Sequence, residues 1–497
     1  MNTMNMRKIS VFIFFILFLN VIVSFNQEDL GKKYYESAMA YMQAGNFIQA
    51  IADLQSIVKS LPDSAYADEA LLELGKYYME QENDKKNAEL YFSMLKEKYI
   101  KTENGPGGYY YLGKVGLFFG ATQEELNNAY ANFERIPLLF PKSKWTQQAL
   151  YESGTTQRYL GQPLKASALL NQAIEKFPGT LYTDQAKLEL AICYLQLNQP
   201  SIALRYVQQV IDHPMDPAVN AMAKNYFGFV YRYGFRDKIV PQPLFQLDTR
   251  FNLTMKLKNP IQFFFENHKN NFYLLDEDQK NITIMNSTGK ISDTKYEENP
   301  QFFFFNYKGD LFIANKKNIS TPQGKQVSFA FTYELKTKFI NSIKEAAVDS
   351  DGNYYIIDRD YKGLFKFNDK AEEIEFPLHK TNEKFKKIFI DKRERIFLLS
   401  DNNKTIKIHK ITGELLTSFF SFHTTNFKDI KDFALDAYDN LYVFDKELNT
   451  MFVFDNLFNP LAQFTFPQDT DPVAFTVGNE GEIYIINKKI KTVQLFR

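Results

Sequence analysis

Leu441, Tyr442, Val443, Phe444 and Asp445 form the stretch that decides the fold, because the second half of the chain contains six versions of this strand. The aromatic residues aligned with Tyr442 recur every 39 to 45 residues. They are Tyr273, Phe312, Tyr355, Phe397, Tyr442 and Tyr484. A period near 40 residues built from strands is typical of a β-propeller, in which each repeat is one four-stranded blade. Six copies predict six blades.

The third copy shows the local pattern most clearly. A short strand ends at Asp349, residues 350–353 supply the Asp-Gly chemistry of a tight turn, and the strand Tyr354 to Asp358 follows. The sixth copy provides only three strands before Arg497. We therefore expect an earlier segment, either residues 243–247 or residues 251–257, to complete the last blade and close the ring.

A second repeat, with helical spacing, precedes the strands. Its residues occur three times in the same order: Pro62, Ser64, Tyr66, Ala70 and Gly75; Pro141, Ser143, Trp145, Ala149 and Gly154; Pro178, Thr180, Tyr182, Ala186 and Ala191. Proline ends one helix, and Ser or Thr two residues later can cap the next. Small residues let paired helices approach closely.

This helical repeat resembles a tetratricopeptide repeat (TPR) array of about five helix pairs. The phrases Leu61 to Ala70 and Phe177 to Ala186 are similar to bacterial envelope TPR families, among them the lipoprotein of the outer-membrane assembly machine and the periplasmic cell-division coordinator. The lipoprotein branch of these families needs a cysteine at the signal-peptide junction, and this chain has none there. The Val348 to Tyr355 phrase, in turn, resembles NHL-type six-bladed propellers.

The fold class that follows is multidomain: an α-solenoid and then an all-β propeller. We expect a signal peptide at residues 1–24, the TPR α-solenoid at 31–234, a linker at 235–243 and the NHL-like propeller at 244–497. Gly234 is expected to end the last helix, and Pro241 and Pro243 lie in a segment that matches neither repeat.

The N-terminal segment predicts secretion. Arg7 and Lys8 precede an apolar run from Ile9, and Ile22 and Ser24 fit a signal peptidase site. The run is shorter than the roughly 20 residues of a membrane span, although an uncleaved anchor is the alternative. We therefore expect a periplasmic or cell-envelope protein. The net charge of +0, from 59 basic and 59 acidic residues, argues against a broad nucleic-acid surface.

The residues that often carry catalysis are sparse. None of the five histidines, at positions 213, 268, 379, 409 and 423, has metal-ligand spacing, and the single Cys193 is expected to be a buried, inert thiol. An Asp or Asn ends the aligned strand in five copies, at Asp276, Asn315, Asp358, Asp445 and Asn487. These could form an axial ring that binds a metal, as in propeller lyases, but bonding of the next turn is the simpler interpretation.

Two other stretches have a functional and a simpler interpretation. Asp349, Asp351 and Asn353 could suggest a calcium loop, but a hairpin turn is favoured because the remaining ligands are missing. The tetraphenylalanine at residues 302–305 could form an adhesive surface, but a buried innermost strand is favoured. The sequence predicts no cofactor and no metal site.

We therefore predict a non-enzymatic interaction scaffold of the bacterial cell envelope, in which the TPR groove and the propeller face each bind a partner. The alternative is a propeller lyase or hydrolase with a TPR targeting arm. Partners are expected to be proteins or peptides, including envelope proteins, or glycans, with no nucleic acid and with membrane contact only through an uncleaved N-terminal segment. The candidate groove residues are Tyr77, Tyr111, Gln157 and Tyr194, near the ends of the first helices of their pairs, where each could equally pack against a neighbouring repeat.

Overall fold

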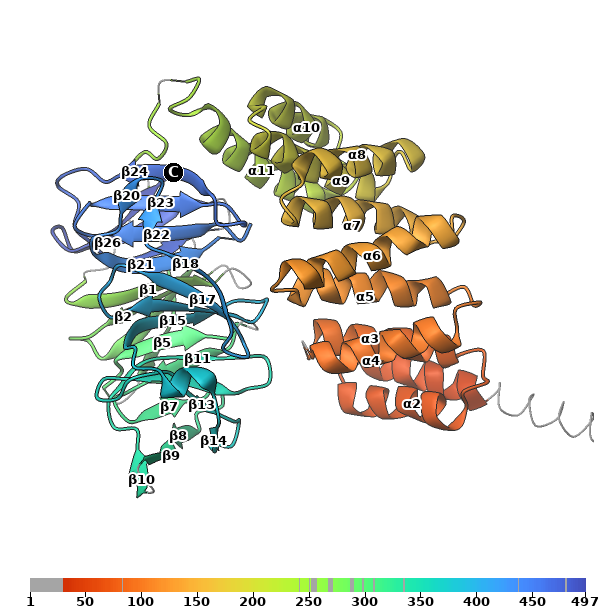
Figure 1. Cartoon of the computed structure of the whole chain (residues 1–497), viewed down its shortest axis with the longest axis horizontal. Coiled ribbons are helices and arrows are strands. Elements are labelled where there is room, and N and C mark those ends of the chain that lie inside the picture. The colour runs from red at the N-terminus through yellow and green to blue at the C-terminus, as the bar shows by residue number, and fades with distance from the viewer. Residues whose placement is uncertain are drawn as a thin grey trace, which may run out of the picture. The chain divides into compact units, whose positions relative to one another are not determined.

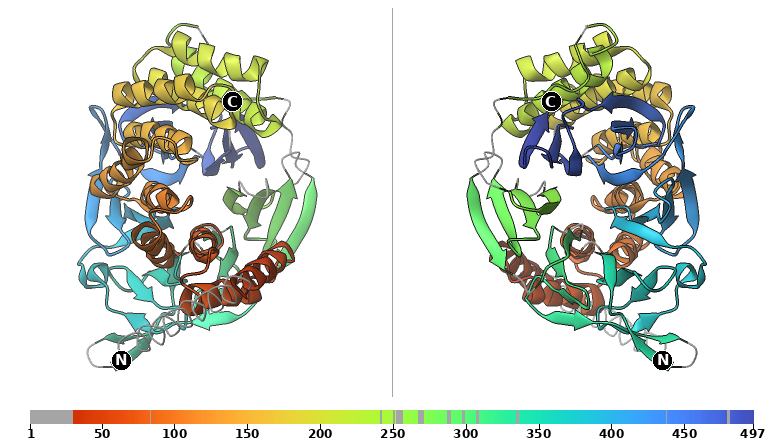
Figure 2. Two further views of the ribbon diagram at one scale, coloured as in Figure 1. Left: turned by 90° about the vertical axis from the view of Figure 1, so that its right-hand side faces the viewer. Right: turned by 90° about the vertical axis from the view of Figure 1, so that its left-hand side faces the viewer.

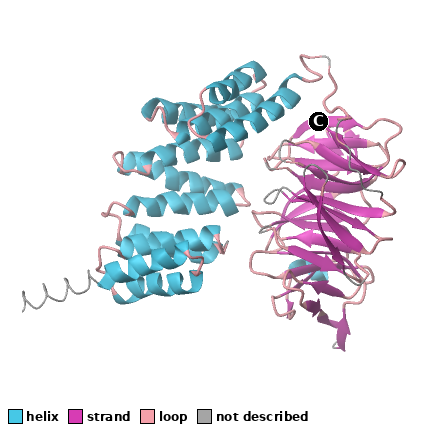
Figure 3. Ribbon diagram, turned by 180° about the vertical axis from the view of Figure 1, so that it is seen from behind, coloured by secondary structure: helices cyan, strands magenta, loops and turns pink. Residues whose placement is uncertain are grey.

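Helices form the N-terminal part of the chain and strands the C-terminal part (Figures 1 and 3). The computed structural model describes residues 30–497, apart from 83, 241, 250, 252–256, 267–270, 287–289, 297–298, 307–308, 334–335, 437 and 479–480. The predicted signal segment at residues 1–24 lies outside this part of the chain. The predicted fold class is confirmed: an α-solenoid is followed by a six-bladed propeller.

The solenoid is a series of antiparallel helices. Residues 30–43 are helical. The helices that follow are α2 (Phe47–Ser60), α3 (Ala67–Glu80), α4 (Lys85–Lys98), α5 (Gly105–Phe119), α6 (Gln123–Leu139), α7 (Thr146–Tyr159), α8 (Pro163–Lys176), α9 (Leu181–Gln196), α10 (Pro200–Asp212) and α11 (Pro217–Phe235).

Glycines hold the paired helices close together. A Cβ atom on Gly75 of α3 would lie 2.3 Å from Phe92 Cε1 of α4, and one on Gly113 of α5 would lie 2.6 Å from Phe133 Cε1 of α6. Gly154 of α7 meets Leu170 of α8 in the same way, at 2.5 Å. The small residues of the repeat therefore allow the close helix approach that the sequence predicted.

The capping prediction is correct in one repeat and wrong in two. Thr180 Oγ1 accepts the backbone N–H of Thr183 and caps α9. Ser64 and Ser143 instead accept the N–H groups of Tyr66 and Trp145, each at 3.3 Å, in the turn before the helix. The reason is that α3 and α7 begin later relative to the proline than α9 does.

In the described part of the chain, six antiparallel sheets form the blades, one for each aligned aromatic residue, and the blades follow one another in a ring (Figure 2). The first three blades are β1 (Pro260–Glu266), β2 (Asn271–Asp276), β3 (Asn281–Asn286) and β4 (Ile291–Tyr296); β5 (Phe302–Phe305), β6 (Leu311–Ala314), β7 (Asn318–Ser320) and β8 (Gln326–Ser328); and β11 (Ile343–Val348), β12 (Tyr354–Asp358), β13 (Phe365–Phe367) and β14 (Glu373–Ile374).

The remaining blades are β15 (Phe385–Ile390), β16 (Arg395–Ser400), β17 (Ile406–Lys410) and β18 (Leu415–Phe419); β21 (Ile430–Leu435), β22 (Leu441–Asp445), β23 (Thr450–Phe454) and β24 (Pro460–Thr465); and β25 (Pro472–Val477), β26 (Ile483–Asn487) and β27 (Thr492–Phe496). Two small hairpins, β9 (Ala330–Tyr333) with β10 (Lys336–Phe339) and β19 (Ser421–Phe422) with β20 (Thr425–Asn426), and the 3-10 helix η1 (Pro377–Lys380) lie between blades. β5 is the edge strand next to β6. The predicted burial of residues 302–305 is confirmed for Phe302 and Phe303, whereas Phe304 and Phe305 are only half-buried.

A segment before the first blade completes the last one. Gln246 and Arg497 exchange two backbone hydrogen bonds, at 2.8 and 2.9 Å, and the N–H of Asp248 donates to Leu495 O at 2.8 Å. Leu244 and Phe245, just before these bonds, are buried. The predicted closure is thus confirmed for residues 243–247, the earlier of the two candidate segments. Most of the other candidate, residues 252–256, lies outside the described residues.

The chain divides into two compact units. The first comprises residues up to 118 together with 127–152, and the second comprises 119–126 together with 153–497. The second unit therefore contains α8 to α11 as well as the propeller. The predicted linker at 235–243 and the domain limits around it stay predictions, but the compact second unit extends across that linker.

One hydrophobic core explains this grouping. Buried residues of α9, α10 and α11 are continuous with buried residues of the fifth and sixth blades. On α11, Tyr226, Phe229 and Tyr233 lie on one face and contact the propeller: Tyr226 and Phe229 pack on Tyr438, at ring-centroid distances of 5.2 and 4.9 Å. The last helices are therefore part of the structure that surrounds the propeller's closing blades.

Candidate functional site

Two of the predicted groove residues lie in the first compact unit. Tyr77 on α3 is half-buried; its ring packs on Phe47, and its hydroxyl donates to Glu82. Burial and Glu82 raise the pKa of Tyr77 to about 12, so its phenol stays protonated at neutral pH. Tyr111 on α5 stacks on Phe92 at 4.7 Å, and Lys76 Nζ lies 5.8 Å from its ring centroid. Lys76 of α3 therefore lies near the ring of Tyr111 on α5.

The other two groove residues lie in the second unit. Gln157 on α7 is only 2% exposed. Tyr194 on α9 stacks on Tyr206 of α10 at 5.6 Å and is half-buried. All four residues thus have packing contacts or burial within the solenoid, and ligand binding through them stays a prediction.

The polar residues at the strand ends of the propeller bond the adjacent turns. Asp358 accepts the N–H groups of Ser342, Asp360 and Tyr361, and Asp445 makes equivalent bonds to residues 428, 429 and 448. Asp276, Asn315 and Asn487 also accept backbone N–H groups. The structure therefore supports the simpler interpretation, in which these residues bond the next turn.

The possible calcium loop is a hairpin turn. Asp349 accepts the backbone and side-chain N–H groups of Asn353 and the hydroxyl of Tyr355. Cys193 is buried, and burial raises the pKa of its thiol to about 12. Within the described ranges no group of three His, Cys, Asp or Glu side chains could hold a metal ion.

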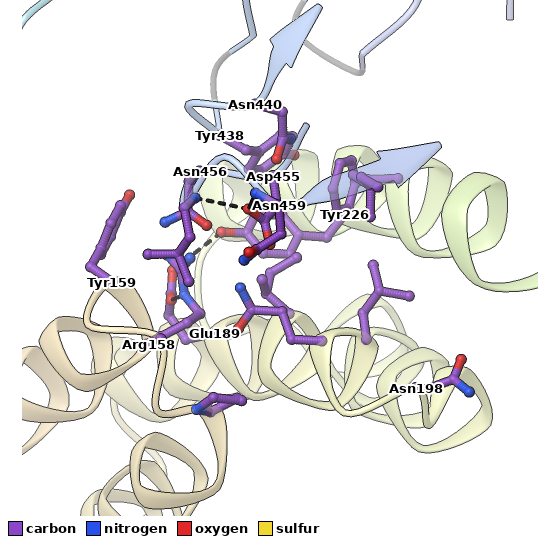
Figure 4. A pocket seen from close by; sticks show the side chains of 18 of the residues that line it. Arg158, Tyr159, Glu189, Asn198, Tyr226, Tyr438, Asn440, Asp455, Asn456 and Asn459 are labelled. Carbon is purple, nitrogen blue, oxygen red and sulfur yellow. Dashed lines mark hydrogen bonds and ion pairs between the residues drawn. The ribbon is translucent and has the colours of Figure 1, made fainter. Parts of the chain in front are cut away.

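A cavity of about 730 Å³ lies inside the second unit, where the C-terminal ends of α7 and α9 and the middle of α11 meet the fifth blade (Figure 4). Its lining combines amide, tyrosine and aliphatic side chains. The helices and the loops between them contribute Arg158, Tyr159, Gly161, Pro163, Glu189, Ile192, Leu195, Gln196, Asn198, Met222, Asn225, Tyr226, Phe229 and Lys238. The propeller contributes Tyr438, Asn440, Asp455, Asn456, Leu457, Asn459, Pro460 and Leu461.

A buried ion pair supports the helical wall of the cavity. Arg158 Nε donates to Glu189 Oε2 at 2.6 Å, and both side chains are less than a tenth exposed. The hydroxyl of Tyr226 also donates to Glu189, at 3.4 Å. These contacts join α7, α9 and α11. Separating the helices would leave one partner of the ion pair as an uncompensated buried charge, so the contacts hold the three helices together.

The propeller wall is fixed by a turn network around Asp436. Its carboxylate accepts the N–H of Tyr438, the backbone and side-chain N–H groups of Asn440, and the hydroxyl of Tyr442. Burial raises the pKa of Asp436 to about 6. Tyr442 and Tyr233 of α11 share a hydrogen bond at 2.8 Å between fully buried hydroxyls. This bond joins the helical and propeller walls.

A second contact between the walls involves Arg393, in the turn between β15 and β16. Its guanidinium lies 4.4 Å from the ring centroid of Tyr159, and its Nη1 donates to Gly120 O at 3.2 Å. Arg158 lies 4.4 Å from the same ring. Burial acts to raise the pKa of Asp439. The positive charges of Lys392, Arg393 and Arg395 outweigh this effect and hold that pKa below its usual value.

Asparagine and glutamine residues are frequent in the cavity lining. Gln196 Oε1 and Asn456 Nδ2 are buried and have no hydrogen-bond partner among the described residues. Asn456 lies in the loop between β23 and β24, and Gln196 is the last residue of α9. Both residues line the cavity, but these two atoms are themselves buried.

None of the four predicted groove residues lines this cavity. One signal for it was present in the sequence. Arg158 and Glu189 occupy otherwise buried helical positions, and Glu189 stands between Leu188 and Leu190, where an unpaired charge is costly. The propeller side had no such signal, because the loop at residues 455–461 reads as an ordinary turn.

Comparisons with known proteins identify the helical repeat. A family model described as "Tetratricopeptide repeat" matches residues 148–180, from α7 to the cap of α9. The helical region thus contains a tetratricopeptide repeat. No curated protein matches the sequence.

Solved propeller structures are similar to about half of this chain. A streptogramin B lyase structure has 12% identity and a TM-score of 0.37, covering 51% of this chain and 97% of its own. Virginiamycin B lyase from Staphylococcus aureus has 14% identity and a TM-score of 0.38, covering 50% and 85%. An auxiliary nutrient binding protein from Bacteroides ovatus has 11% identity and a TM-score of 0.37, covering 49% and 70%. These similarities assign no activity to this chain. None of the helices in the described ranges combines the length and the apolar composition of a membrane span.

Proposed function

We propose that this chain is a non-enzymatic interaction scaffold of the bacterial cell envelope, in which the TPR groove and the propeller face each bind a partner. TPR solenoids and propellers typically bind other proteins, because stacked helices offer an extended groove and blade loops a broad face. The repeats are proposed to be of the envelope TPR type and the propeller of the NHL type, on the sequence phrases quoted above. The envelope location rests on the signal-like segment at residues 1–24.

The observation that carries this proposal is the surface shared by α3 and α5. Tyr77, Tyr78 and Tyr111 are all half-buried, so part of each ring stays accessible after packing. Lys76 lies near Tyr111 and forms an ion pair with Glu73 at 2.7 Å. Tyrosine presents a large, rigid and amphipathic contact area, which is why it is enriched in protein interfaces.

Photo-crosslinking in intact cells tests the proposal. A benzoyl-phenylalanine at position 77 or 111 keeps an aromatic ring in place and should crosslink the same envelope protein from both helices. Leu138 on α6, which is 74% exposed, is the matched control position. The proposal also requires Tyr77→Ala with Tyr111→Ala to reduce capture of the identified protein at least tenfold, with a thermal midpoint close to that of the wild type. Crosslinking from position 138 alone, or no crosslink from 77 and 111, would overturn the proposal.

A further inference from the structure

A β-bulge recurs near the start of the first strand of the blades. The register of the described strands is shifted there in five blades. A bulge inserts one unpaired residue into a strand and re-aims its side chain. The unpaired residues, in the first, third, fourth, fifth and sixth blades, are Ile261, Lys344, Lys386, Lys431 and Val473. Three successive blades therefore carry a lysine at the same position.

The bulge leaves two consecutive residues accessible in each of these three blades. In the fourth blade residues 386–387 are half-buried, whereas Phe385 and Ile388 on either side of them are buried. The same pattern, two accessible residues between two buried ones, occurs at residues 343–346 in the third blade and at 430–433 in the fifth. The lysines therefore reach the surface from strands that are otherwise packed in the propeller core.

The three lysines lie on neighbouring strands. β11 contacts β15, and Lys387, which follows Lys386 on β15, forms an ion pair with Asp432 of β21. β21 leads to a turn whose Tyr438 packs on α11, and Lys431 lies at the opposite end of that strand, next to its first residue. A ligand can therefore reach the lysines without displacing α11.

One of the three lysines is already paired with a carboxylate. Lys344 Nζ donates to Asp401 Oδ1 at 2.9 Å. Lys386 and Lys431 form no ion pair and no side-chain hydrogen bond within the ranges that the structure describes. Two positive charges of this face are therefore available to an anion.

The lysine charges also repel one another. Burial and the positive charges of Lys431 and Lys344 lower the pKa of Lys386, and the carboxylates of Asp429 and Asp401 only partly offset this effect. A negatively charged ligand would reduce the repulsion, because an opposite charge nearby favours the charged form of a lysine.

Neighbouring residues limit where an anion is attracted. Further along the strands it would meet the carboxyl groups of Glu345 and Asp432, which directly follow Lys344 and Lys431. The bulge residues of the first and sixth blades are aliphatic and add no charge. The attraction is therefore greatest at the lysines of the third, fourth and fifth blades.

We propose that Lys386 and Lys431, assisted by Lys344, bind a small anion that carries two or more negative charges on carboxylate or phosphate groups. Two unpaired lysines call for two negative charges, which one polyvalent anion supplies. Lysine ammonium groups bind both kinds of oxyanion as point charges. This inference goes beyond the proposed scaffold function, because the site does not involve the tyrosine surface of α3 and α5.

Isothermal titration of the full-length chain with citrate and with pyrophosphate, at an ionic strength held constant with sodium chloride, tests the proposal. At least one probe should bind with one site per chain, and the tighter probe distinguishes a carboxylate ligand from a phosphate ligand. Lys386→Gln and Lys431→Gln should each weaken binding by about tenfold, since each removes one charge-assisted contact. Lys386→Arg keeps the charge and should bind more tightly than Lys386→Gln.

Lys370→Gln is the matched control. Lys370 is an exposed lysine of the third blade, in the turn between β13 and β14, and its replacement should leave binding unchanged. Acetylation of wild-type lysines, followed by mass spectrometry, keeps the test decisive if a variant fails to fold. The bound probe should slow acetylation of Lys386 and Lys431 and should leave that of Lys370 unchanged.

Four results would overturn the inference: neither probe binds the wild type, both Gln variants at positions 386 and 431 bind as tightly as the wild type, Lys386→Arg loses as much affinity as Lys386→Gln, or the probe slows acetylation of Lys370 as much as that of the two bulge lysines. The last result would indicate general charge screening. Crosslinking at positions 77 and 111 is independent of these outcomes, so the scaffold proposal and the anion site can fail separately.

Discussion

At the scale of single residues, two tyrosines with the same place in their blades have different surroundings. Tyr355 and Tyr442 are both fully buried, and each donates to the aspartate that organises its hairpin turn, Asp349 or Asp436. Tyr442 additionally shares a hydrogen bond with Tyr233 of α11. The tyrosine at this position therefore bonds only its hairpin turn in the third blade. In the fifth blade it bonds both the turn and α11.

We predict that Tyr442→Phe destabilises the protein more than Tyr355→Phe, because it removes two buried hydrogen bonds rather than one. A buried hydrogen bond contributes about 1 kcal/mol, so the difference between the two variants should be about 1 kcal/mol in the free energy of unfolding. Urea denaturation followed by tyrosine fluorescence measures it. Equal losses for the two variants would show that the Tyr233 bond contributes nothing.

Glu345 should make stability depend on pH. In the third blade Glu345 is paired with Ile357 of the neighbouring strand. Lys387 and Asp432 stand at the equivalent position in the fourth and fifth blades. Burial raises the pKa of Glu345 from 4.5 to about 7; Lys387, Lys344 and Arg359 oppose this shift and Asp432 adds to it. The folded state thus holds its proton more tightly than the unfolded state between about pH 4.5 and 7, so this group's contribution to stability decreases as pH rises through that window.

We predict that Glu345→Gln removes this decrease. Each unit of pKa shift corresponds to about 1.4 kcal/mol, and the group is half-titrated in one of the two states at each end of the window. The free energy of unfolding of the variant relative to wild type should therefore increase by about 2.5 kcal/mol between pH 4.5 and 7. Chemical denaturation at several pH values gives the comparison. A constant difference between variant and wild type across this range would mean that Glu345 titrates normally in the folded protein.

At the scale of elements, closure of the ring depends on main-chain atoms. The N–H of Asp248 donates to Leu495 of the last strand, β27, and the N–H of Gln246 donates to Arg497, the residue after it, while the side chain of Gln246 is exposed. Without this pairing β27 would have an open edge, and an open edge promotes aggregation as well as instability.

We predict that Gln246→Pro destabilises the propeller by about 3 kcal/mol or more, because proline lacks the N–H that bonds Arg497 O and restricts the backbone. Gln246→Ala keeps that N–H and should change stability by less than about 0.5 kcal/mol. Thermal unfolding monitored by circular dichroism near 218 nm compares the two variants. Similar midpoints for Pro and Ala would contradict closure by this segment.

At the scale of the whole molecule, the sequence predicted both repeats, the blade number and the closing strand, because each depends on local periodicity. It placed the linker at residues 235–243 by composition and did not reveal the core that extends across it. That core depends on the pairing of Tyr226, Phe229 and Tyr233 with Tyr438 and Tyr442, more than 200 residues away. An α11 sequence rich in aromatic residues indicates burial but does not identify the partner. The cavity was missed for the same reason, since its two walls come from different repeats.

The account's central claim is that α9 to α11 and the closing blades share one core and so open together. Hydrogen exchange of the full-length chain, followed by mass spectrometry at increasing denaturant, tests it most directly. Peptides from α11 and from β22 and β26 should lose protection at the same denaturant concentration and with the same opening free energy. Loss of protection in α9 to α11 at a lower denaturant concentration, while β22 and β26 remain protected, would contradict a shared core.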